Sequence, residues 1–297
     1  MLETTSTPLR LLIHRRDVAA ELRKSPQVTV TRCDLGRPET LAGALDGVER
    51  IVHFAGVLFK ARPERFLPTT NTLYFRHLVE AAVAAKVRRL LLISFPHVEG
   101  VTTPESPATG RLDGHPQSAH ARTRLQEEQH LFAAAERHGF EGVSLRVGMV
   151  YGRGILMCDA ARWLARHRLL AVWKEPTWIH LLSKDDFLEA TSNAALRPGI
   201  RGIYHLGDDG VQTLQAFLDL AATEWRVPLP WRMPLRLIYA AAWLCELQSA
   251  LLGTTAPLTR DFVTIGRASY CGDTRRMREE LLAKLQYPTV AEGRAIL

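Results

Sequence analysis

Short apolar runs alternate with amphipathic stretches over the first two thirds of the chain. The apolar runs predict buried strands at residues 11–14, 27–32, 50–54, 89–94 and 142–147. Between them, apolar positions recur at helical spacing and predict helices at residues 17–24, 38–45, 68–86 and 118–138. Strands that alternate with helices on short links predict an α/β fold built on a parallel, doubly wound sheet.

The pattern changes after residue 150 and predicts a second, smaller lobe. We expect a helix at 155–175, strands at 178–182 and 202–206, a helix at 184–196 between them, and mostly helical structure from 213 onward. We therefore assign residues 1–150 to a nucleotide-binding domain to which 176–207 return. Residues 151–175 and 208–297 form the mostly helical lobe, which we expect to bind the substrate.

Residues 95–117 are rich in Pro, Gly, Thr and His and show no periodicity. They follow the most apolar strand, and open α/β sheets place their ligands at the carboxyl ends of strands. The sequence therefore predicts that this loop borders the functional site.

The net charge of +7 arises from 38 basic against 31 acidic residues, spread along the whole chain. It indicates attraction to anionic partners such as dinucleotide phosphates or a membrane surface, or simply an arginine-rich, solvated exterior. No basic run is interleaved with aromatic residues, so we expect no nucleic-acid partner.

The four cysteines are far apart and show no metal-ligand spacing. This usage predicts reduced thiols in a cytoplasmic protein without a metal site. The first residues lack the apolar core of a signal peptide, so we do not expect secretion. The expected partner is a small-molecule substrate, and the question of a homodimer stays open.

The most informative stretch runs from residue 116 to residue 154. Its predicted helix carries His120 and Arg124 four positions apart, which places them on one face. The strand that follows ends in Arg146-Val147-Gly148-Met149-Val150-Tyr151-Gly152.

This order resembles the extended short-chain dehydrogenases/reductases, the NAD(P)-dependent epimerase/dehydratase family. That family carries Tyr-x-x-x-Lys on the helix and ends the strand in Arg-Pro-x-x-Val-Tyr-Gly. Further similar segments occur in the same order at residues 34–35, 54–56, 71–82, 185–186, 202–207, 214–218 and 273–293. The resemblance covers residues 10 to 290 and implies a Rossmann-like fold.

The resemblance also implies which residues would hold NAD or NADP. The Asp of Asp34-Leu35 matches the one that contacts adenine, and Arg124 matches the Lys that holds the nicotinamide ribose. The other positions matched to cofactor segments are Leu35, Phe54, Ala55, Gly56, Asn71, Val147 and Val150. Arg15 and Arg16 follow the first predicted strand, where an arginine suits the 2′-phosphate of NADP. A solvated pair at the end of a strand would have the same sequence pattern.

The catalytic set of the family is replaced here. Its Ser or Thr position is Phe95, with Ser94 next to it, and its Tyr and Lys positions are His120 and Arg124. We interpret His120 as a proton carrier, Arg124 as its charge partner and Ser94 as the remaining hydroxyl donor. The alternative is a solvent-facing His–Arg pair on a helix that no longer carries chemistry.

The chain contains no Gly-x-x-Gly-x-x-Gly motif, and its first glycine is Gly36. By resemblance, its first strand corresponds to the family's second, so we expect the first strand and its glycine-rich, phosphate-binding loop to be missing. A misplaced start codon, a different element in that place or a partner chain would each account for this.

Residues 227–253 are strongly apolar, but Arg232, Arg236 and Glu246 interrupt the length that a bilayer requires. This segment resembles the helical lobe of the 3β-hydroxysteroid dehydrogenase-like and flavonol-reductase-like branches. It predicts a buried helix, the wall of an apolar pocket, or a peripheral membrane contact through residues 231–252.

We therefore expect an NAD(P)-dependent oxidoreductase or epimerase that acts on a carbinol or ketone carbon of a sugar nucleotide or an apolar small molecule. The replaced residues indicate impaired or non-standard catalysis. The alternative is a non-catalytic nucleotide-binding or scaffold protein that retains the fold.

Overall fold

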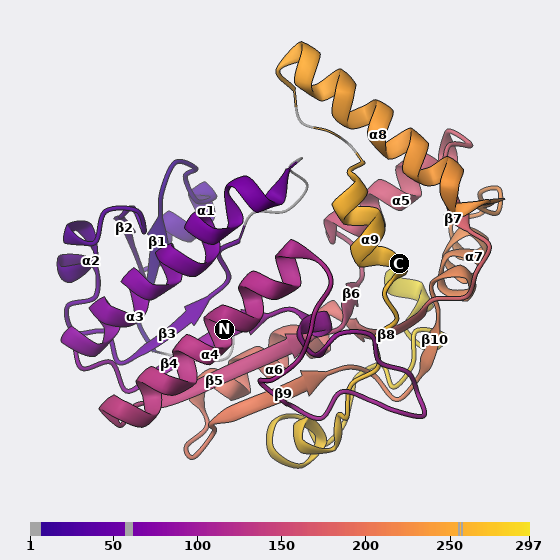
Figure 1. Ribbon diagram of the computed structural model, residues 1–297. Coiled ribbons are helices and arrows are strands. Elements are labelled where there is room, and N and C mark those ends of the chain that lie inside the picture. The colour runs from indigo at the N-terminus through magenta and orange to yellow at the C-terminus, as the bar shows by residue number, and fades with distance from the viewer. Residues whose placement is uncertain (1–6, 57–61, 255, 257) are drawn as a thin grey trace.

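The computed structural model describes residues 7–56, 62–254, 256 and 258–297 (Figure 1). Its largest sheet has four parallel strands in the order β3-β4-β5-β9. These are β3 (Arg50–His53), β4 (Arg89–Ser94), β5 (Glu141–Val147) and β9 (Gly202–Leu206). The predicted Rossmann-like α/β fold is confirmed.

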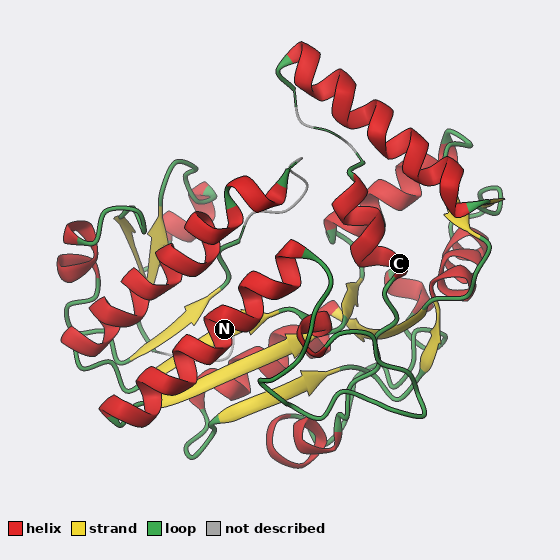
Figure 2. Ribbon diagram, viewed as in Figure 1, coloured by secondary structure: helices red, strands yellow, loops and turns green. Residues whose placement is uncertain are grey.

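Helices cover both faces of this sheet, as Figure 2 shows. The helices are α3 (Tyr74–Ala84), α4 (Ala119–His138) and α6 (Lys184–Leu196). Within β4, Leu90 and Leu92 pack in the apolar cluster that includes α3, whereas Leu91 packs in the cluster that includes α6. This alternation is why an unbroken apolar run forms a strand that is buried on both sides.

The first two strands form a sheet of their own, apart from the main sheet. β1 (Leu9–Ile13) pairs in parallel only with β2 (Val28–Arg32), and no hydrogen bond joins β1 to β3 in the described part of the chain. Short helices α1 (Ala20–Lys24) and α2 (Glu39–Ala44) accompany them. In folds with the strand order 3-2-1-4-5-6, another strand lies between the counterparts of β1 and β3. The structure describes no such strand.

The second lobe is more mixed than the sequence pattern predicts. It holds a three-stranded sheet of β6 (Met149–Tyr151), β8 (Trp178–Ser183) and β10 (Val211–Thr213), and a pair formed by β7 (Ala171–Trp173) and β11 (Trp231–Met233). Its helices are α5 (Leu156–Arg166), α7 (Leu214–Glu224), α8 (Leu235–Leu252) and α9 (Arg260–Arg267).

Two helices have bounds that differ from the prediction, and one strand joins a different sheet. The helix expected at 155–175 ends at Arg166, because Arg168 adopts a positive φ and residues 171–173 pair with β11. The helix expected at 68–86 begins as a π-type turn at Pro68–Leu73 and ends at Ala84. β8 joins the small sheet rather than the main one, and the boundaries of the two domains stay a prediction.

Helix α8 projects from the second lobe (Figure 1). Among the described residues it is the one helix whose length and composition would allow it to cross a membrane, and only 11% of it is buried. Ile238 and Ala242 are its buried residues. The interpretation of this segment as a buried helix is therefore wrong.

Candidate functional site

Most residues matched to cofactor segments follow the carboxyl ends of strands. Arg15 and Arg16 follow β1, Asp34 follows β2, residues 54–56 follow β3, and Val147 ends β5. Because the strands within each sheet are parallel, residues 54–56 and Val147 share the carboxyl edge of the main sheet, and Arg15, Arg16 and Asp34 share that of the β1–β2 sheet. Doubly wound folds bind ligands at such edges.

At the carboxyl edge of the β1–β2 sheet, Asp34 lies between a histidine and a turn. Its Oδ2 is 3.4 Å from Nε2 of His14, and its Oδ1 accepts a hydrogen bond of 2.9 Å from the amide of Gly36. Arg15 and Arg16 are exposed, and their guanidinium groups have no polar partner among the described residues. Leu35 packs against the apolar cluster that includes α3. This edge therefore offers one carboxylate and two free cations.

Arg124 of α4 reaches the loop after β3. Its Nη2 donates to the carbonyl of Ala55 at 3.0 Å, and its Nη1 donates to Oε2 of Glu127 at 2.7 Å. A Cβ placed on Gly56 would lie 2.2 Å from Nη2. Position 56 therefore needs a glycine for the guanidinium to remain where it is. Phe54 is exposed and meets Phe187 edge-on at 6.3 Å between ring centroids.

Burial shifts the pKa values of the ionisable groups around Arg124. Burial raises the pKa of Glu127 to about 7, although the charge of Arg124 opposes this shift. Burial, together with the charge of Arg124, lowers the pKa of His53 to about 3. Hence His53 is neutral at physiological pH, and Arg124 is the dominant positive charge in this part of the site.

His120 lies one turn before Arg124 and is only 4% exposed. Its ring meets Phe95 edge-on at a centroid distance of 4.9 Å. Burial, followed by the charge of Arg124, lowers its pKa to about 4, so the imidazole is neutral at pH 7. Because Arg124 is likewise 6% exposed, the alternative of a solvent-facing His–Arg pair is wrong.

Ser94 is not brought together with His120. Phe95 has an extended backbone (φ −111°, ψ 140°), and consecutive residues of an extended chain point to opposite sides. Since Phe95 faces His120, Ser94 points away from it. Its buried Oγ has no hydrogen-bond partner among the described residues.

Of the remaining matched positions, Asn71 and Val147 are buried and Val150 is half-buried. Nδ2 of Asn71 donates to Oγ1 of Thr123 at 3.2 Å, while its Oδ1 has no partner in the described part of the chain. Val147 and Val150 pack in the apolar cluster that includes β5 and α6. Asn71 thus joins the π-type turn before α3 to α4, and the two valines pack at the end of β5.

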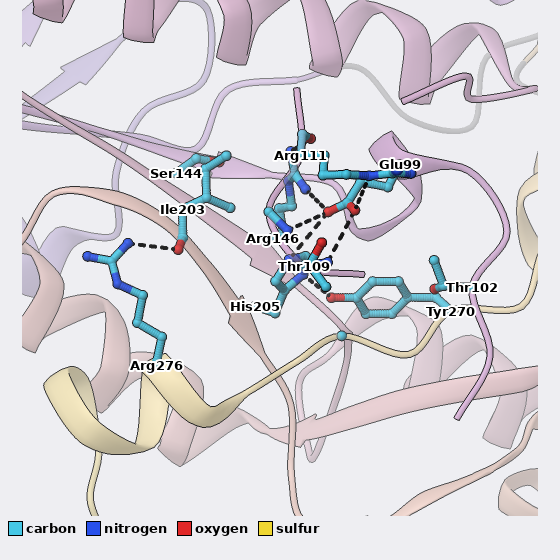
Figure 3. A network of polar contacts seen from close by, with 12 residues as sticks. Glu99, Thr102, Thr109, Arg111, Ser144, Arg146, Ile203, His205, Tyr270 and Arg276 are labelled. Atoms are coloured by element: carbon cyan, nitrogen blue, oxygen red, sulfur yellow. Dashed lines mark hydrogen bonds and ion pairs between the residues drawn. The ribbon is translucent and has the colours of Figure 1, made fainter. Parts of the chain in front are cut away.

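Sequence reasoning missed a buried polar network beside this site (Figure 3). Arg146 of β5, fully buried, pairs with Glu99 through Nη1 and with Glu128 of α4 through Nη2 at 2.6 Å. Its Nη2 also donates to the carbonyl of Arg111 at 2.7 Å. Ser144, two residues earlier on the same strand face, donates to Glu128 at 2.8 Å. A polar Ser-x-Arg pattern within an apolar strand was the available signal.

Glu99 ties the loop of residues 95–117 to this network. Burial alone would raise its pKa, but the His205 imidazole 3.5 Å away, hydrogen bonds from the amides of Gly110 and Thr109, and the charge of Arg146 lower it to about 2. His205 of β9 in turn shares a hydrogen bond of 2.9 Å with the hydroxyl of Tyr270. The network therefore joins the loop, strands β5 and β9, helix α4 and the C-terminal segment.

The residues present suit the two ends of a nicotinamide dinucleotide. Asp34 with Arg15 and Arg16 can bind the adenosine part, and Arg124 uses two of its five N–H groups on protein atoms, which leaves donors for ribose hydroxyls. Oε1 of Glu127 is buried beside them without a partner among the described residues. The sequence offers no glycine-rich turn for the pyrophosphate.

Comparison with known proteins gives consistent relatives. A uronate dehydrogenase of Pseudomonas putida is 25% identical over 175 residues, which cover 59% of this chain and 58% of that protein. The chain therefore spans little more than half the length of the uronate dehydrogenases it matches.

Two solved structures share the fold over nearly the whole chain. A dTDP-glucose 4,6-dehydratase of Streptomyces venezuelae, solved with NAD, is 16% identical with a TM-score of 0.73, covering 99% of this chain and 87% of that one. RMD of Pseudomonas aeruginosa, solved with NADPH, is 18% identical with a TM-score of 0.69, covering 97% and 98%. The profile of the NAD dependent epimerase/dehydratase family matches residues 7–188, more than half of the chain. The chain belongs to the NAD dependent epimerase/dehydratase family.

Proposed function

We propose that this chain binds a nicotinamide dinucleotide along the carboxyl ends of its parallel strands and oxidises or reduces a carbinol or ketone carbon by non-standard proton chemistry. When bound, the nicotinamide gives or accepts hydride. The single observation that carries the proposal is the burial of His120 and Arg124 together beside Ala55 and Gly56. A helix that had lost its role would have no need to keep a cation and an imidazole out of water.

In this proposal Arg124 positions the nicotinamide ribose and stabilises negative charge on the substrate oxygen. His120 exchanges a proton with that oxygen. Phe95 cannot donate a hydrogen bond, so His120 has no hydroxyl group to share this task on its own side of the strand. The proton transfer therefore depends on one neutral imidazole with a low pKa.

We propose a sugar acid or sugar nucleotide as the substrate class. The support is the similarity to a uronate dehydrogenase and the shared fold with a dTDP-glucose dehydratase. An apolar substrate has less support, because the tryptophans of the second lobe do not gather around one hollow. Trp173 and Trp225 are buried in its core, whereas Trp163, Trp231 and Trp243 are exposed.

A second candidate is a non-catalytic nucleotide-binding or scaffold protein. The observation that favours it is the engagement of Arg124 with Glu127 and the Ala55 carbonyl, which occupies the guanidinium without any ligand. Dinucleotide binding without turnover of any sugar acid or sugar nucleotide would support this candidate over the first.

Replacing His120 separates the two candidates. We expect His120→Gln to lower the turnover of a uronic acid or nucleotide sugar by about 100-fold or more, because a general acid/base contributes that much. NADH and NADPH affinity, followed by fluorescence titration, should change by less than about twofold, since the adenosine contacts remain. Turnover that survives the substitution would remove His120 from the mechanism.

The pH profile gives an independent check. Because the pKa of His120 is about 4, the imidazole is already neutral above that value. We expect the rate of substrate oxidation to be flat from about pH 6 to pH 9 and to fall only on acidification toward about pH 4. A rise of the rate through pH 9 would instead indicate a phenol or lysine as the base.

The choice between NADP and NAD can be tested at Arg15 and Arg16. We propose a preference for NADP, in which these exposed guanidinium groups bind the 2′-phosphate. Arg15→Gln with Arg16→Gln should weaken NADPH binding by about tenfold or more and leave NADH binding within about twofold. The control is Arg137→Gln, which replaces an exposed arginine in the last turn of α4. Equal losses for both dinucleotides would contradict the preference.

A further inference from the structure

The outer side of α8 carries a continuous apolar surface. Its large exposed residues are Leu237, Trp243, Leu244, Leu247, Leu251 and Leu252, which we call the α8 ridge. Leu244 is 57% and Leu251 77% exposed. Single exposed leucines are common on protein surfaces, but a row of them on one helix is typical of an interaction surface.

The geometry of the helix explains why these residues face outward together. Leu237, Leu244 and Leu251 are seven residues apart, so they lie on one side of the helix two turns from each other. Ile238 and Ala242 lie on the opposite side and belong to the core of the second lobe. Packing on the body of the protein thus uses one stripe of α8 and leaves the wider side uncovered.

The apolar surface continues beyond the helix. Trp231 is 63% exposed, and Leu169 and Leu229 are exposed beside it. Nε1 of Trp231 donates to the carbonyl of Arg168 at 3.1 Å, and its backbone amide donates to Leu170 at 2.9 Å. These bonds join β11, which precedes α8, to the turn after α5.

Three cations border the same surface. Arg166, Arg168 and Arg236 are exposed, and their guanidinium groups have no ion pair or side-chain hydrogen bond within the described ranges. The acidic residue of α8, Glu246, is already paired with Arg260 at 2.8 Å. The border of the apolar surface is therefore positively charged.

We propose that this surface docks on a lipid bilayer with anionic headgroups. Aromatic and leucine side chains enter the interface while the arginines meet lipid phosphates. A second copy of the chain is a poorer occupant, because a twofold interface would bring the same unpaired arginines together. The proposal rests on exposure and charge alone and is independent of any dinucleotide chemistry.

The helix would lie along the membrane rather than cross it. Ile238 and Ala242 hold one side of α8 to the second lobe, and the Glu246–Arg260 ion pair fixes it to α9. A crossing helix would have to abandon both contacts. Only the outer side is therefore available to lipid.

Vesicle co-sedimentation of the full chain tests the proposal. Vesicles of phosphatidylcholine with phosphatidylglycerol should bind the protein, and Leu244→Glu with Leu251→Glu should lower the partition coefficient by about tenfold or more. Leu188→Glu replaces a leucine of α6 that is about as exposed as Leu244, and it should change the partition coefficient by less than about twofold. Circular dichroism should show both variants folded, because all three side chains are exposed.

The contribution of the arginines to membrane binding is tested with a double variant and a control of equal charge. Arg166→Gln with Arg236→Gln should weaken binding to the anionic vesicles by about fivefold or more, because each arginine near the bilayer adds to the electrostatic attraction. Arg137→Gln with Arg201→Gln removes the same net charge elsewhere and should have little effect. Failure of the wild-type chain to bind anionic vesicles would overturn the proposal. So would a dimer by light scattering that Leu244→Glu with Leu251→Glu dissociates while vesicle binding is absent.

Discussion

Arg146→Met should lower the free energy of unfolding by about 3–5 kcal/mol, the largest effect of a single substitution that we expect in this protein. The guanidinium is fully buried between Glu99 and Glu128. Without it, two carboxylates would face each other out of contact with water, and the carbonyl of Arg111 would lose its donor. Urea denaturation followed by circular dichroism measures the loss.

The cause can be separated from lost packing by neutralising the partners. The triple variant Arg146→Met, Glu99→Gln and Glu128→Gln carries no unpaired buried charge and should recover about 2 kcal/mol relative to Arg146→Met alone. The control Arg137→Met removes an exposed guanidinium and should stay within about 0.5 kcal/mol of wild type. A triple variant less stable than Arg146→Met would refute the electrostatic explanation.

Asp208→Asn should stabilise the protein, and by more as the pH rises. Asp208 is 2% exposed, and its Oδ2 has no hydrogen-bond partner in the described part of the chain. Burial, followed by the charges of neighbouring aspartates, raises its pKa to about 8. The folded protein therefore keeps this proton at pH values where the unfolded chain, with a pKa of about 3.9, has lost it.

The sign of the pH effect follows from this difference. Between these two pKa values the folded state binds more protons, so the wild type loses about 1.4 kcal/mol of stability per pH unit as the pH rises. Asparagine does not ionise and avoids this loss. The advantage of Asp208→Asn should grow by about 2–3 kcal/mol from about pH 5 to pH 7.

Denaturation at a series of pH values measures the difference between variant and wild type. The control Asp113→Asn changes a carboxylate that is 81% exposed, so its difference from wild type should not vary with pH by more than about 0.5 kcal/mol. A constant difference between Asp208→Asn and wild type would show that the carboxyl group is ionised in the folded protein.

The main sheet could be predicted because its signals are local. Leu90, Leu91 and Leu92 form an apolar run whose alternation fills two clusters on opposite faces of the sheet. The pairing of strands is not local, and the gap between β2 and β3 could be expected only from the family resemblance, which leaves the strand between them missing. Equally, residues 171–173 form a strand because β11 pairs with them from about sixty residues away.

The candidate site likewise has features that local sequence predicts and features that depend on distant segments. The spacing of His120 and Arg124 on one helix face is a local property, and the structure has both side chains buried on that helix. The orientation of Ser94 depends on which face of β4 meets α4, which a single strand does not reveal. Glu99 and Arg146 are 47 positions apart, and Glu99 lies in a loop without periodicity, so no sequence motif predicts their ion pair.

The sequence by itself determined the family, the order of strands and helices in the main domain and the helix face on which the site lies, because spacing along a chain fixes short-range geometry. Only the tertiary structure decided that the His–Arg pair is buried, that Arg146 holds two carboxylates and that α8 faces outward. An apolar helix has the same pattern whether a core or a membrane covers it. Burial, and with it every pKa shift in the site, depends on distant segments meeting in space.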